Sequence, residues 1–318
     1  MFREEDIILR ADHITKEFPA SGGRKVRACD DVSLCVYKGK TLGVAGESGC
    51  GKSTFARVLM QLETAEQGAI LYHGRDLNKL SRAEQRENRQ KIQMVFQDPM
   101  ASFNPKMRVV DILTEPLLNF KRIAKKDKRD VAAKLLKMVE LPEDFMDRFP
   151  HSMSGGQRQR IGIARALSLN PEILVCDEAT AALDVSIQET IIELLMKLQR
   201  EQGISIVFIC HDIALIQSIS HQMAVMYLGS VVEVIPGDKI KAEAAHPYTK
   251  ALLGSLFSVK MDRDKKIEVL EGDVPSPLDI PQGCPFQDRC PQCQALCKTE
   301  KPALKDVGEG HQVACHFA

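Results

Sequence analysis

The sequence lacks a net charge, long apolar runs and an apolar N-terminal stretch. Lysine and arginine together number 43, and aspartate and glutamate together also number 43. The chain therefore has no general basic excess of the kind that attracts nucleic acid, and we expect it to bind none. No apolar run approaches the roughly 18 residues that a membrane-spanning helix needs. Residues 1–6 lack the apolar stretch of a secretory signal, so we expect the protein to stay in the cytoplasm.

The ten cysteines are unevenly distributed along the chain. Because cytoplasmic thiols stay reduced, we expect these cysteines to be buried, reactive or metal-binding rather than paired in disulfides. Five of them lie between Cys284 and Cys315. The length of 318 residues and the apolar fraction of 44% are those of an ordinary globular protein with one large or two modest domains.

A glycine-rich stretch has the spacing of a phosphate-binding loop, with two glycines, a lysine and a hydroxyl residue at fixed positions. Its glycines let consecutive backbone N–H groups point into one concavity. Lys52 can reach the β- and γ-phosphates of a nucleotide, and the Ser53 hydroxyl can ligate Mg²⁺. The stretch consists of Gly46, Glu47, Ser48, Gly49, Cys50, Gly51, Lys52 and Ser53, and Thr54 follows it. This pattern predicts a nucleoside triphosphate site.

The surroundings of this loop support the prediction. Residues 41–45 have the composition of a short buried strand, and a helical apolar stripe begins at Phe55. The N-terminus of such a helix adds free amides and a partial positive charge to an anion site.

Polar residues end three further apolar segments. Gln97 follows residues 94–96, Asp177 and Glu178 follow residues 173–176, and His211 follows residues 204–210. Uninterrupted apolar runs of this length are typical of strands buried on both faces of a parallel sheet, and helical patterns between them indicate βαβ crossovers. Ligands of open α/β sheets bind beyond the carboxyl ends of the strands. We therefore predict that these side chains converge on one nucleotide.

Two other regions complete the α/β prediction. Residues 7–36 alternate polar and apolar positions around a glycine turn, which favours antiparallel strands. Ser154, Gly155, Gly156 and Gln157 directly precede a helical stripe. Ser154 can simply cap that helix, or the small residues can form a second anion-binding helix end.

In order and spacing, these segments resemble the ATP-binding cassette family. The resemblance covers roughly residues 7–235 and implies a P-loop NTPase fold with an N-terminal antiparallel part, a RecA-like parallel-sheet core and a helical insertion. It implies that Phe18 stacks on adenine and that Asp184 belongs to the loop at residues 181–184. Met153 and Ala181 depart from the family's usual residues without removing a group that the mechanism requires.

Within that family, the sequence resembles the ATPase subunits of peptide and nickel importers, and this resemblance rests on residues 97–99, 102–105 and 246–249. The resemblance predicts a cassette at residues 1–235, with a helical subdomain at about 98–168, and a Cys-rich extension at residues 236–318. It implies uptake of dipeptides, oligopeptides or nickel, driven from the cytoplasmic face of the membrane by a peripheral subunit.

The resemblance also assigns chemistry and partners. Lys52 and Mg²⁺ would neutralise phosphate charge, with Mg²⁺ held by Ser53, Gln97 and Asp177. Glu178 would act as general base, and His211 would contact the γ-phosphate. The signature residues 154–157 would close on the ATP of a second, non-identical ATPase subunit. Two membrane-spanning permease subunits and an extracytoplasmic substrate-binding protein would complete the importer.

Four cysteines of the extension could hold a metal: Cys284, Cys290, Cys297 and Cys315. Four thiolates suit an iron–sulfur cluster or a tetrahedral zinc, and ligand number alone does not choose between these two and no metal. Cys293 lies outside the family's pattern and is expected to be accessory or inert.

Two alternative functions use the same loop. One is a soluble cassette ATPase of DNA repair, translation or iron–sulfur assembly, which the importer-like extension and the neutral charge argue against. The other is a nucleotide-dependent regulatory module without turnover, which Gln97, Glu178 and His211 argue against.

Overall fold

The computed structural model describes residues 2–181, 183–254 and 275–318, which form two compact units. The first comprises Met1–Lys79 and Ile209–Ala318, and the second Leu80–Phe208. Ala182 of the predicted loop at residues 181–184 and residues 255–274 of the predicted extension lie outside the described residues. The domain boundary at residue 235 stays a prediction.

The first unit contains an antiparallel sheet in the strand order β2-β1-β4-β5. These strands are β1 (Ile7–Pro19), β2 (Lys25–Tyr37), β4 (Gln67–Tyr72) and β5 (Arg75–Asp76). A turn between β1 and β2 contains Gly22 with a φ of 72°, a conformation that glycine adopts without steric cost. Phe18 pairs with Val26 beside this turn, so the antiparallel prediction for residues 7–36 is confirmed.

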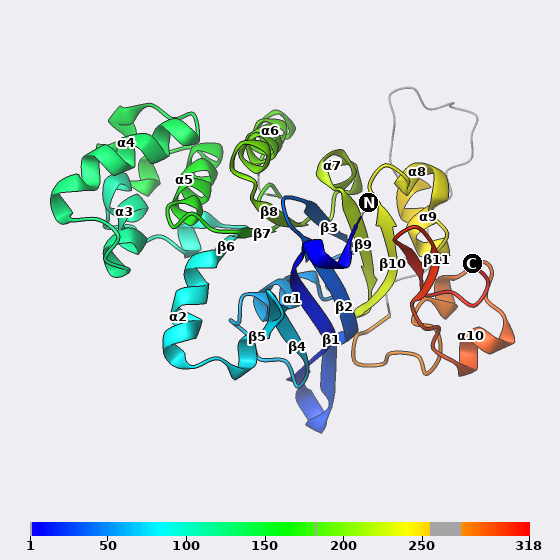
Figure 1. Ribbon diagram of the computed structural model, residues 1–318. Helices are drawn as coiled ribbons and strands as arrows, with labels where there is room; N and C mark the ends of the chain where they lie inside the picture. The colour runs from blue at the N-terminus through cyan, green and yellow to red at the C-terminus, as the bar shows by residue number, and fades with distance from the viewer. Residues whose placement is uncertain (1, 182, 255–274) are drawn as a thin grey trace. The chain divides into compact units, whose positions relative to one another are not determined.

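A second set of strands in this unit carries the phosphate loop. β3 (Thr41–Ala45) pairs in parallel with β9 (Gln222–Tyr227), which pairs with β10 (Ser230–Pro236). The C-terminal strands β12 (His311–Val313) and β11 (Lys305–Gly308) continue the order beyond β10 (Figure 1). Thus the last residues of the chain extend the sheet that holds the loop.

Short helices accompany these strands: α1 (Lys52–Leu59), α7 (Ile213–Ile219), α8 (Ile240–Glu243), α9 (Pro247–Gly254) and α10 (Ala295–Thr299). α7 packs so closely on β3 that a Cβ at Gly43 would overlap the side chains of Ser220 and Ile216. The buried side of α1 consists of Lys52, Phe55, Ala56, Val58 and Leu59.

The second unit has parallel strands and most of the long helices. β6 (Ile92–Val95), β7 (Ile173–Asp177) and β8 (Ser205–Ile209) are neighbours in that order, and all residues of β7 and β8 are buried. The helices are α2 (Arg82–Lys91), α3 (Val109–Asn119), α4 (Lys128–Met138), α5 (Gly155–Leu167) and α6 (Val185–Gln202). α3, α4 and α5 lie together as a helical group (Figure 1).

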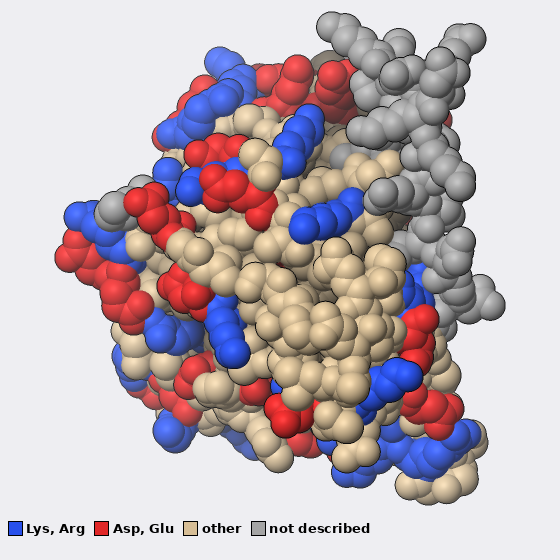
Figure 2. Space-filling model, turned by 90° about the vertical axis from the view of Figure 1, so that its right-hand side faces the viewer, with Lys and Arg blue, Asp and Glu red and all other residues tan. Residues whose placement is uncertain are grey.

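The hydropathy of the helices and the distribution of surface charge bear on function. Among the described helices, none combines the length and the hydropathy needed to cross a membrane. On the face displayed in Figure 2, positive and negative side chains are interspersed around an area of uncharged residues.

Candidate active site

The phosphate loop lies between β3 and α1 and depends on its glycines. Gly46 has a φ of 148° and Gly51 a φ of 105°. A Cβ at Gly46 would overlap the carbonyl oxygen of Met226, and one at Gly51 that of Ala28. Only glycine allows the loop to lie this close to neighbouring backbone while adopting these angles. The spacing that predicted the loop therefore has a direct steric cause.

Lys52 lies inside the loop and is 4% exposed. Its Nζ donates to the carbonyl oxygens of Gly46, at 2.7 Å, and Glu47, at 2.9 Å. Gly51, the N-cap of α1, has no side chain to cap the helix, so amides of the first turn point toward the loop, as in other anion sites at helix N-termini. A buried cation beside these amides is suited to bind phosphate.

His211 belongs to the same unit as this loop. The backbone N–H of Cys210, which precedes it, donates to the carbonyl of Val44 at 3.4 Å. Val44 lies on β3, just before the loop. The carboxylate of Asp212 caps α7 by accepting from the N–H groups of Ala214 and Leu215. Sequence reasoning missed this cap, although Asp directly before an apolar helical segment is a typical N-cap pattern.

The carboxylates and Gln97 lie in the second unit. β6 and β7 run parallel, with Val95 opposite Cys176. The two strands therefore end at the same edge of the sheet. Asp177 is the last residue of β7, and Gln97 lies two residues beyond Val95. Asp177 is buried, and Gln97 is exposed. The side chain of Glu178 is half-buried, and its φ of 47° is uncommon for a residue with a side chain. Such local strain is typical of functional sites.

Ser154 is the N-cap of α5, as the sequence predicted. Its hydroxyl accepts from the N–H of Gln157 at 3.3 Å, and the Gln157 side chain accepts from the N–H of Ser154 at 2.9 Å. This reciprocal pair is a capping box. Gly156 lies against α6, where a Cβ would meet the side chain of Ile187. Asp184 is the exposed residue before α6.

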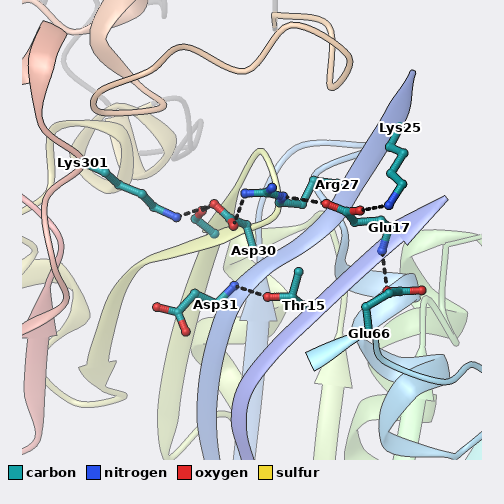
Figure 3. Close-up of polar contacts among 9 residues, drawn as sticks. Thr15, Glu17, Lys25, Arg27, Asp30, Asp31, Glu66 and Lys301 are labelled. Atoms are coloured by element: carbon teal, nitrogen blue, oxygen red, sulfur yellow. Dashed lines mark hydrogen bonds and ion pairs between the residues drawn. The ribbon is translucent and has the colours of Figure 1, made fainter. Parts of the chain in front are cut away.

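Phe18 is half-buried at the end of β1, and Lys16 Nζ lies 5.0 Å from its ring centroid. Beside it is a network of ion pairs that sequence reasoning missed (Figure 3). Glu17 binds Lys25 and Arg27, and Arg27 also binds Asp30. Lys301, from the C-terminal region, binds the same carboxylate. Glu17, Lys25, Arg27 and Asp30 line a pocket of about 620 Å³ together with neighbouring residues of β1, β2 and the start of β4.

The structure does not support an iron–sulfur cluster. Cys284, Cys290, Cys297 and Cys315 line one pocket, but its volume of about 10 Å³ is close to that of a single water. Among residues 2–181, 183–254 and 275–318, no three His, Cys, Asp or Glu are placed to bind a metal. Burial raises the pKa of the Cys284 thiol to about 11. The four thiols pack as small core or half-buried groups, and Cys293 is not among the pocket's lining residues.

The structure thus brings the predicted residues together in two sets. One contains the phosphate loop and His211, and the other contains Gln97, Asp177 and Glu178. Their convergence on one nucleotide, and each residue's role, stay predictions.

Comparison with known proteins defines the class first. Residues 29–181 match the family model described as "ABC transporter". A solved ATP-binding cassette, a dimer in a post-hydrolysis state bound to ADP and Pi, is 31% identical, with a TM-score of 0.66 over 72% of this chain and 98% of that chain. The fold is therefore that of an ABC ATPase, a P-loop ATP-hydrolysing cassette.

The particular family follows from full-length relatives. Residues 232–297 match "Oligopeptide/dipeptide transporter, C-terminal region". The oligopeptide transport ATP-binding protein OppF of Salmonella typhimurium is 47% identical over 92% of this chain and 88% of that protein. A probable peptide ABC transporter ATP-binding protein of Sinorhizobium fredii is 46% identical over 98% of this chain and 90% of that protein. The chain belongs to the ATP-binding subunits of oligopeptide and dipeptide ABC transporters.

Proposed function

We propose that this protein hydrolyses ATP at the cytoplasmic face of the membrane to drive uptake of dipeptides or oligopeptides, with nickel as the other cargo class. The observation that carries the proposal is the phosphate loop, where Lys52 lies buried beside the uncapped N-terminus of α1. The extension at the C-terminus supports the peptide class because its family model matches residues 232–297.

Residues of both units would contribute to ATP binding and hydrolysis. Lys52 and the loop amides would bind the phosphates, and Phe18 would stack on adenine. Mg²⁺, when bound, would neutralise phosphate charge, and the oxygen donors of Ser53, Gln97 and Asp177 are the kind that it prefers. Glu178 would take the proton of the attacking water, and His211 would hold the γ-phosphate side.

A second cassette would complete each site. Ser154 to Gln157 form the N-terminal end of α5, where Ser154 is exposed and Gly155 and Gln157 are half-buried; there they can meet the ATP of a partner subunit. We infer a related, non-identical ATPase as partner. Two permease subunits and a substrate-binding protein outside the membrane would supply the path and the cargo selectivity.

A pocket of the second unit fits contact with a permease. It has a volume of about 270 Å³ and lies next to Gln97, and its lining includes Phe96, Pro99, Phe103 and Phe120. Phe96 is 38% exposed and belongs to an apolar lining with Pro99, Phe103 and Phe120, and contiguous apolar surface of this kind suits contact with a partner. A permease segment docked here would adjoin a residue of the nucleotide site.

Co-expression with the neighbouring membrane-subunit genes tests this proposal. The wild-type chain should purify with the integral membrane subunits in detergent and should show higher ATPase activity in that complex. Phe96→Asp should lose co-purification while retaining ATP binding, because a carboxylate in an apolar contact costs desolvation energy. Val307→Asp, at an exposed apolar position of β11, is the matched control and should behave as wild type. A wild-type chain found only in the soluble fraction would favour the soluble-ATPase alternative.

A further inference from the structure

The C-terminal region reaches back to the phosphate loop through Arg289. This residue ends a short 3₁₀ turn, Gln287–Arg289. Its guanidinium donates to both carboxylate oxygens of Glu47, at 2.8 and 3.1 Å. Arg289 is only 5% exposed and Glu47 26% exposed in their side chains. Two-point Arg–carboxylate pairs of this kind fix orientation as well as charge.

Tyr248 of α9 forms a hydrogen bond with the backbone of the same loop residue, Glu47. The N–H of Glu47 donates to the Tyr248 hydroxyl at 3.0 Å. On the other side of that peptide bond, the carbonyl of Gly46 accepts from Lys52. Because the N–H and C=O of a trans peptide point in opposite directions, this one peptide plane is held between Lys52 and Tyr248. Its orientation also determines where the Lys52 ammonium lies.

An aromatic cluster keeps both residues in place. Tyr248 is fully buried, with ring centroids 4.7 Å from Tyr227 of β9 and 5.3 Å from Phe286. Tyr227 and Phe286 meet edge to face at 5.2 Å. The Arg289 guanidinium lies 5.9 Å from the Tyr227 ring centroid. Such packing restricts rotamers, so the residues that contact the loop have fixed positions.

We propose that Arg289 and Tyr248 are positioning residues for ATP binding, through which the C-terminal region sets the conformation and the charge of the phosphate loop. This inference assumes the proposed function only in that ATP binds at the loop. Glu47 places a carboxylate within a site for a polyanion, and the Arg289 guanidinium neutralises it. Without Arg289, that negative charge repels the phosphates. Without the Tyr248 hydroxyl, the peptide that places Lys52 loses one of its two anchors.

The test measures ATP affinity, KM and kcat of the full-length chain together with its thermal unfolding midpoint. Arg289→Met should weaken ATP binding about 10-fold and raise KM, with kcat within about 2-fold of wild type, because a charge-assisted pair next to the ligand is lost. Arg289→Lys keeps the charge but not the two-point geometry and should recover part of the affinity. Lys305→Met removes an exposed cation of β11 in the same region and should leave affinity unchanged.

A double variant separates charge from a general loss of structure. Adding Glu47→Gln to Arg289→Met removes the carboxylate that was left without its partner and should restore most of the affinity. If Arg289→Met fails to fold, Tyr248→Phe decides, since it keeps the buried ring and removes only the hydroxyl; it should weaken binding about 3-fold or more. Wild-type affinity in Arg289→Met or in Tyr248→Phe, or no recovery in the double variant, would overturn the inference. A wild-type chain that binds no ATP would instead overturn the proposed function.

Discussion

The two sets of site residues differ in how they are built. In the first unit, the phosphate loop consists mainly of backbone, its lysine is 4% exposed, and Gly46 and Gly51 have no room for a side chain. In the second unit, Gln97 and Ser154 are exposed and Glu178 is half-buried. We therefore expect the first set to act as a rigid phosphate-binding site, whereas the second presents individual side chains at strand and helix ends.

This difference implies that binding and turnover can be separated by substitution. A rigid loop that binds phosphate through many amides supplies affinity. Side chains that act on the attacking water supply rate, because only interactions gained in the transition state raise kcat.

The largest effect is expected for Glu178→Gln. The amide keeps the shape of the side chain but cannot accept the proton of the attacking water, so kcat should fall by about 10²- to 10⁴-fold. ATP affinity should stay near that of the wild type. Steady-state ATPase assays and calorimetric titration with ATP measure the two quantities. Glu189→Gln, at an exposed carboxylate of α6, is the control, and wild-type turnover in the Glu178 variant would remove this residue from the role of base.

A smaller effect, on ATP affinity rather than on kcat, is expected for Lys52→Ala. Charge-assisted hydrogen bonds contribute about 1.5–3 kcal/mol each, so ATP affinity should fall roughly 10- to 100-fold. Equilibrium titration with ATP gives the dissociation constant directly. Lys79→Ala removes a cation that is 83% exposed, and this variant should have the dissociation constant of the wild type. Unchanged affinity in the Lys52 variant would contradict the receptor role of the loop.

The parts of the site that the sequence predicted have local patterns. The loop follows from glycine spacing, the buried strand β7 from its apolar run, and the Ser154 cap from small residues before a helical stripe. These features depend on neighbours within a few positions, so a single sequence carries them. One boundary was shifted: β6 ends at Val95, whereas Gln97 was predicted to lie at the strand end itself.

The contacts that the sequence did not predict join distant positions. Arg289 and Glu47 are 242 residues apart, and Lys301 and Asp30 are 271 residues apart. Nothing in the local pattern of either partner distinguishes such a pair from solvated surface charges, because tertiary packing alone brings them together. The sequence left the metal content of the four cysteines open for a related reason: the spacing of thiols along the chain does not fix their geometry in the fold.

The smallest effect concerns the strand that leads into the rigid loop. The N–H of Thr41, the first residue of β3, donates to His221 Nδ1 at 3.1 Å, which requires that nitrogen to be unprotonated. Burial, assisted by the charge of Lys40, lowers the pKa of His221.

Since the unfolded chain keeps a histidine pKa of about 6.5, it binds more protons than the folded protein below that pH. The titration of His221 therefore does not affect the free energy of unfolding above about pH 6.5, and it lowers that free energy as the pH falls below this value. The slope stays under the one-proton limit of about 1.4 kcal/mol per pH unit, and partial exposure lowers it further.

Denaturant unfolding from pH 8 to pH 5 should show a shallower loss of stability in His221→Asn, whose side-chain oxygen can accept the same hydrogen bond without titrating. His151→Asn, at an exposed histidine, should leave the slope unchanged. An identical slope in the wild type and the His221 variant would show that this histidine does not couple protonation to folding, and that the base of the loop is insensitive to pH.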